Sequence, residues 1–136
     1  MRKQKIKRVA LIFLIVFLII GFYLQYGRDM DVYNSYVFSV GSHNEQNLKI
    51  VANKLWIKDK RKYAEEILEK CKANSFKSID FCYDSYIPNE LYVDVYLSDI
   101  YIKIGHPLFS FSYLPEDAKS EYNFLDDSEK YVLKIQ

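Results

Sequence analysis

The chain has 136 residues and a net charge of +1, with 19 basic and 18 acidic side chains. It contains four glycines and three prolines against 13 tyrosines and nine phenylalanines, a composition that excludes a disordered stalk. Its length excludes a large multidomain protein, since the roughly 110 residues that follow an apolar start are enough for one domain with one core.

An apolar segment at residues 9–26 follows a basic tail at residues 1–8. As a helix, its 18 residues would span about 27 Å, close to the thickness of a bilayer's hydrocarbon core. A cleaved secretory signal would end in small residues at alternating positions, and neither Gly21 nor Gly27 has a small residue two positions before it. We therefore expect a transmembrane signal-anchor helix at residues 9–26, with cleavage as the alternative.

The distribution of charge predicts the orientation of this helix. Five basic residues precede it, whereas Arg28 is the one basic residue between its end and Lys49. The positive-inside rule then leaves residues 1–8 in the cytoplasm and residues 27–136 outside, as in a single-pass protein of the cell membrane. Because the basic tail is explained as a topology signal, we expect no nucleic-acid partner.

The outer segment begins with a stretch rich in β-branched and aromatic residues at 29–41, which predicts a strand. The sequence from Ser42 to Glu45 then fits a capping box, and apolar residues follow at helical spacing as far as Leu55. Asp59 fits the N-cap of a second helix that carries an apolar stripe ending at Cys71. We expect two helices with a bend near Asp59, or one long helix.

After residue 74 the apolar period changes from helical to alternating. Alternation predicts strands around residues 79–83, 91–97, 109–113 and 130–136. The predicted fold is therefore α+β: a transmembrane helix, then one domain at 27–136 with one or two helices packed on one face of a three- to five-stranded antiparallel sheet. Cystatin-like and NTF2-like rolls are the nearest shapes by analogy.

Three stretches of this domain, "EKCKANSFKSIDFCYD", "PNELYVDVYLSDIYIKIG" and "LFSFSYL", resemble uncharacterised small single-anchor extracytoplasmic proteins of Gram-positive bacteria. The resemblance covers roughly residues 59–114 and contains no specific motif. It implies the topology given above and adds no chemistry.

The sequence contains no recognisable catalytic or metal-binding signature. His43 and His106 lack partners at metal-ligand spacing, and no serine lies in a nucleophile motif, so we expect no metal and no cofactor. Cys71 belongs to the helical stripe, whereas Cys82 alternates with Phe81 and Tyr83. The two cysteines then point to different sides, which predicts free thiols, with a disulfide as the alternative.

One group of residues remains as a candidate binding surface. If the large apolar side chains of the strands face the core, the opposite sheet face presents aromatic rings interleaved with carboxylates. The candidate binding residues are Tyr92, Asp94, Tyr96, Asp80 and Asp84, accompanied by Cys82, Ser110 and Ser112. An ordinary solvated face and a contact with a second subunit are the alternatives.

These features predict a non-catalytic, membrane-anchored extracytoplasmic interaction module whose partner is a protein or a component of the cell envelope. The alternative is a small cell-envelope hydrolase or accessory enzyme with an active site that is not visible in the sequence. A deep cleft that joins His43 or His106 to a carboxylate would favour the enzyme, and a flat sheet face would favour the interaction module.

Overall fold

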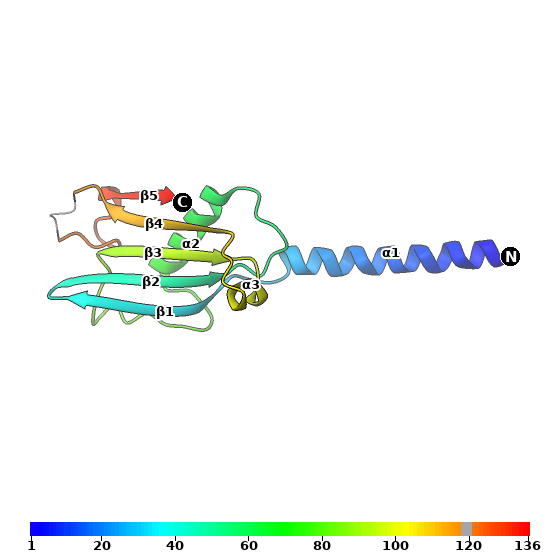
Figure 1. Ribbon diagram of the computed structural model, residues 1–136, viewed down its shortest axis with the longest axis horizontal. Coiled ribbons are helices and arrows are strands. Elements are labelled where there is room, and N and C mark those ends of the chain that lie inside the picture. The colour runs from blue at the N-terminus through cyan, green and yellow to red at the C-terminus, as the bar shows by residue number, and fades with distance from the viewer. Residues whose placement is uncertain (118–120) are drawn as a thin grey trace.

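The computed structural model describes residues 1–117 and 121–136 and shows a long helix projecting from one end of a small α+β domain (Figure 1). The described elements are α1 (Arg2–Tyr26), β1 (Asp31–Val40), β2 (His43–Val51), α2 (Lys60–Ala73), β3 (Glu90–Tyr96), α3 (Asp99–Lys103), β4 (Phe109–Pro115), the 3-10 turn η1 (Ser128–Lys130) and β5 (Tyr131–Ile135).

The first helix, α1, is long and apolar enough to cross a membrane. It also includes most of the basic tail, because the helix begins at Arg2. Of the residues of α1, all of which the structure describes, Gln25 alone is buried. The apolar length of the helix therefore lies outside the domain, and the helix enters the protein interior only through the Gln25 side chain of its last turn.

The sheet has five strands in the order β1-β2-β3-β4-β5. Neighbouring strands pair antiparallel except β2 and β3, which pair in parallel. A parallel pair requires a crossover connection, and α2 lies within that connection. The predicted antiparallel sheet is therefore wrong in this respect: the sheet is mixed.

The crossover helix α2 covers one face of the sheet (Figure 1). Asp59 is its N-cap, as predicted, and its carboxylate accepts a hydrogen bond from the Lys62 backbone N–H at 3.1 Å. The helix buries an apolar stripe, including Ile67 and Cys71, against the inward residues of the strands. This burial of the apolar stripe is the main source of stability for a helix of this length.

The helix predicted over residues 42–55 is wrong, because residues 43–51 form β2. Leu48 and Ile50 alternate into the core as strand residues do, and Gln46 occupies the preceding inward position. A buried glutamine concealed the alternation in the sequence. Gly41 has a positive φ of 61°, which fits the tight turn joining β1 to β2 and not a continuing helix.

The strand predicted at residues 79–83 is also wrong: this segment is irregular, although Phe81 and Tyr83 do pack on the core. The side-chain amide of Asn74 forms hydrogen bonds with the Phe81 backbone that a neighbouring strand would otherwise form. It donates to the Phe81 carbonyl at 2.9 Å and accepts from the Phe81 N–H at 2.8 Å.

The strands predicted near residues 29–41, 91–97, 109–113 and 130–136 are confirmed as β1, β3, β4 and β5. The short helix α3 was not predicted.

Candidate functional site

The sheet face opposite α2 carries part of the predicted binding group. Tyr92 and Asp94 of β3 lie on this outer face, where Tyr92 is in register with Asn47 and Ser112 of the neighbouring strands. Ser110 donates to the Asp94 carboxylate at 2.6 Å. The pairing of β2, β3 and β4 thus fixes where the Tyr92 side chain and the nearby Asp94 carboxylate lie on this face.

The environment of Tyr92 keeps its hydroxyl protonated. Partial burial raises its pKa, and the nearby carboxylates of Glu90 and Glu45 raise it further. The hydroxyl donates to Glu90 Oε2 at 3.3 Å. Near neutral pH, Tyr92 therefore offers a hydrogen-bond donor and an aromatic ring, and its protonated hydroxyl does not act as a base.

Other members of the predicted group are not exposed on this sheet face. Tyr96 has the right alternation but is only 4% exposed, and α3 contacts the strand that carries it. Asp80 and Asp84 are exposed in the irregular segment between α2 and β3, on either side of the core residues Phe81 and Tyr83. The structure therefore brings Tyr92 and Asp94 together and separates Tyr96, Asp80 and Asp84 from them.

The first strand adds side chains to the outer face that are not among the residues predicted from the sequence. Tyr36 and Phe38 of β1 are 58% and 61% exposed. Tyr36 lies in register with Asn47, which is itself in register with Tyr92. A shallow hollow of about 80 Å³ lies between these strands and is lined by Asn34, Tyr36, Asn47, Leu48, Lys49, Tyr92 and Asp94. The alternation of residues 34, 36 and 38 was visible in the sequence, but its neighbour β2 was assigned to a helix.

Among the strands that the structure describes, β1 is the first in the sheet order, so its outer edge has no partner strand there. Val40 pairs with His43 across a two-residue turn, and such a closing pair is a hydrogen-bonded pair. The N–H and C=O groups of successive residues in a strand point to opposite sides. Because those of Val40 point toward β2, those of Ser35, Val37 and Ser39 point to the free edge. This edge has no proline and no lysine, which are the residues that commonly protect edge strands.

A histidine and a carboxylate lie near each other at the end of the sheet far from α1. His43 Nε2 is 3.6 Å from Glu90 Oε2, and the His43 side chain is about half exposed. Neither residue lines the two largest hollows among the described residues, nor the hollow on the outer sheet face. His106 is exposed in the loop after α3. The arrangement is a partly exposed pair at the surface, and it does not form the deep cleft between a histidine and a carboxylate that would favour the enzyme hypothesis.

No candidate metal centre is found in the part of the chain that the structure describes. Within residues 1–117 and 121–136, no three His, Cys, Asp or Glu side chains are grouped so that they could hold a metal ion.

Both cysteines are free, with Cys71 buried and Cys82 exposed. Burial raises the pKa of the Cys71 thiol to about 12, although the charge of Lys72 acts in the opposite direction.

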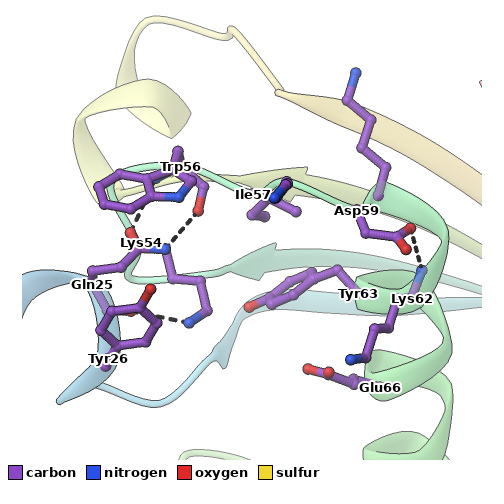
Figure 2. A pocket seen from close by; sticks show the side chains of 11 residues that line it. Gln25, Tyr26, Lys54, Trp56, Ile57, Asp59, Lys62, Tyr63 and Glu66 are labelled. Atoms are coloured by element: carbon purple, nitrogen blue, oxygen red, sulfur yellow. Dashed lines mark hydrogen bonds between the residues drawn. The ribbon is translucent and has the colours of Figure 1, made fainter.

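A second region of interest is the junction between α1 and the domain (Figure 2). The Gln25 amide donates to the Trp56 carbonyl at 3.0 Å, and its side-chain oxygen accepts from the N–H groups of Leu55 at 2.8 Å and Trp56 at 3.2 Å. Lys54 Nζ donates to the Gln25 backbone carbonyl at 3.0 Å and lies 5.5 Å from the Tyr26 ring centroid. The last turn of α1 is thus joined to the segment that follows β2.

Comparison of the chain with protein-family models, curated proteins and solved structures finds no match. The analogy with cystatin-like or NTF2-like rolls therefore stays a prediction, and the function has to be argued from the geometry of the chain itself.

Proposed function

We propose that this protein is a non-catalytic, membrane-anchored extracytoplasmic binding module. In this proposal α1 remains in the membrane, and the free edge of β1, with the outer sheet face beside it, binds an extended segment of a partner polypeptide. The observation that carries the proposal is the long, unprotected edge strand with exposed aromatic side chains.

The contacts of Gln25 favour a retained anchor over a cleaved signal. Cleavage after Gly21 would remove residues 1–21 and leave the last turn of α1 as a short chain end at the junction, and cleavage after Gly27 would remove Gln25 itself. The N–H groups of Leu55 and Trp56 would then lose the acceptor that they share. Folded proteins satisfy such groups, so the domain is built to keep the last turn of α1.

The chemistry of the β1 edge indicates an extended polypeptide as the partner. The outward N–H and C=O groups of Ser35, Val37 and Ser39 repeat at the spacing of a strand, and another strand supplies the matching groups. Tyr36 and Phe38 would then contact apolar side chains on one face of that strand. Main-chain bonds would supply affinity, and the two rings would supply selectivity.

Antiparallel pairing with the β1 edge of a second copy of this chain is opposed by the direction of β1. Figure 1 shows β1 running away from the end of α1, roughly along the helix axis. Antiparallel pairing of two β1 edges relates them by a two-fold axis perpendicular to the strands, which would place the two α1 helices at opposite ends. Two copies anchored in one membrane cannot adopt that arrangement.

The proposal is tested by photo-cross-linking of the full chain in intact cells. A photoreactive phenylalanine analogue in place of Tyr36 or Phe38 should capture the same product. The analogue in place of Lys134, on the opposite edge strand β5, should not capture it. A product with twice the mass of the chain would show self-association, and capture equal from both edges would overturn the proposal.

A matched pair of variants tests whether the edge backbone is used. Ser39→Pro removes an outward N–H, whereas Ser39→Ala keeps that N–H and removes the same side-chain bond to Asn44, which measures 2.6 Å. We expect capture to be lost with proline and retained with alanine, with similar melting temperatures for both variants. Capture that survives Ser39→Pro would exclude strand addition at this edge.

A further inference from the structure

Large apolar side chains are exposed at the end of the domain from which α1 projects. They come from the segment after β2 and from α3, which Figure 1 places at this end. The two segments are joined by backbone bonds from Ala52 N to Tyr96 O at 2.8 Å and from Lys54 N to Leu97 O at 3.2 Å. We call the following set, with its exposed fractions, the membrane-side surface: Leu55 46%, Trp56 53%, Ile100 66%, Tyr101 37% and Ile104 68%.

The residues of α1 that lie beside the membrane-side surface show at which level of the helix this surface is found. Leu55 and Trp56 share an apolar groove of about 300 Å³ with residues of α1 that include Phe17, Leu18 and Phe22. These three residues lie one to two turns before Gln25, within the stretch that is apolar enough to cross a membrane. If α1 spans a bilayer, the side chains of Leu55 and Trp56 lie beside acyl chains and not in water.

Lysines surround this apolar surface. A hollow of about 880 Å³ at the junction is lined by Lys54, Lys58, Lys60 and Lys62, against the acidic residues Asp59 and Glu66 (Figure 2). The Asp59 carboxylate is already engaged at the start of α2. The hollow therefore has an excess of positive charge. Outside it, α3 carries Lys103 between the exposed Ile100 and Ile104.

The wall of the hollow also contains a hydroxyl group without a partner. Tyr63 lines it, and its buried hydroxyl has no hydrogen-bond partner among the described residues. Buried hydroxyl groups are normally bonded. Because the hydroxyl oxygen is closed off from the surface, the lysines are the groups of the hollow that an oxygen-rich ligand can reach.

We propose that the membrane-side surface binds anionic lipids of the bilayer that α1 spans. Leu55, Trp56 and the isoleucines of α3 enter the boundary between headgroups and acyl chains, and the lysines hold lipid phosphates in and around the hollow. This inference rests on the proposed membrane anchoring. It goes beyond that proposal because it fixes the domain on the membrane surface, whereas a simple tether would leave it free to tilt.

The test uses the full chain reconstituted in phosphatidylcholine vesicles, with or without phosphatidylglycerol. Trp56 is the single tryptophan of the chain, so its fluorescence reports this surface directly. Brominated phosphatidylcholine, which quenches tryptophan on contact, should quench Trp56. It should also quench an Ile104→Trp variant on a Trp56→Phe background. A Phe38→Trp variant on the same background, at the far part of β1, should not be quenched.

Anionic lipid should increase quenching in the Ile104→Trp variant. Combined replacement of Lys58, Lys60 and Lys103 by glutamine should remove that increase, with a loss of roughly tenfold or more in the docked population. Quenching at position 104 no greater than at position 38, in protein that resists carbonate extraction, would overturn this proposal and leave the anchor standing. Release of the chain by carbonate would instead refute the anchor as well.

Discussion

Gln25 and Trp56 form a reciprocal pair in which the glutamine amide donates to the Trp56 carbonyl at 3.0 Å and accepts from the Trp56 N–H at 3.2 Å. The side chain of Gln25 thereby acts toward residue 56 as a partner strand would. Helix and domain are joined by specific bonds, and not merely by the short chain between Tyr26 and β1.

Replacing Gln25 by alanine should loosen this junction. The N–H groups of Leu55 and Trp56 would lose their acceptor, at a cost of about 1–3 kcal/mol for groups left unsatisfied. Amide hydrogen exchange should therefore become faster at these two positions and remain unchanged in β3 and β4. Gln4→Ala, at an exposed position near the other end of α1, is the matched control. Equal exchange in both variants would show that the pair does not hold the junction.

The two tyrosines of β3 should differ sharply in their effect on stability. Tyr96 is buried, so Tyr96→Ser should lower the free energy of unfolding by about 2–5 kcal/mol. Tyr92 is partly exposed on the outer face, and Tyr92→Ser should cost less than about 1.5 kcal/mol. Denaturant unfolding of the detergent-solubilised chain measures both, with the exposed Tyr33→Ser as control. Similar losses for Tyr92 and Tyr96 would mean that the outer face is covered.

The cysteines should differ in reactivity and also report the orientation of the chain. Because the pKa of Cys71 is raised to about 12 by burial, its thiol stays protonated and unreactive at pH 8 and below, whereas Cys82 is exposed. A membrane-impermeant maleimide added to intact cells should label Cys82 and leave Cys71 unlabelled, as Cys82→Ser would verify. Labelling of Cys82 only after the cells are lysed would place the domain in the cytoplasm.

Asn74 should be important for two separable reasons. It has a positive φ of 53° at the end of α2, and its side chain forms two hydrogen bonds with the Phe81 backbone. Asn74→Gly removes the bonds but tolerates the backbone conformation, whereas Asn74→Ala also introduces strain, so alanine should be less stable by about 1 kcal/mol. Thermal melting of both variants measures the difference. Equal melting temperatures would show that strain plays no part.

The parts of the fold that were predictable have a regular pattern. The apolar run of α1, the N-cap at Asp59, and the alternation in β3 and β4 are each signalled by neighbours in sequence. Strand β2 was missed because Gln46 interrupts its inward apolar row, and its outward residues are polar. Its parallel pairing with β3 depends on a crossover, which local patterns do not contain.

The candidate site was only partly predictable for the same reason. Alternation placed Tyr92 and Asp94 on one face, but it could not show that the chain after β3 buries Tyr96. It also could not identify Tyr36 as their neighbour, because that relation passes through β2. The junction was invisible in the sequence, since Gln25 appeared there as one polar residue at the end of an apolar run.

The alignment of β1 with α1 has a mechanical consequence. A partner bound along β1 and the membrane anchor at its start would pull in opposite directions along the same strand (Figure 1). Hydrogen bonds between β1 and a strand added at its free edge would lie across that direction, so tension would load that ladder in shear rather than opening it one rung at a time. If the chain is anchored and binds its partner as proposed, this alignment would let the partner resist a pull from the membrane without being peeled from the edge strand.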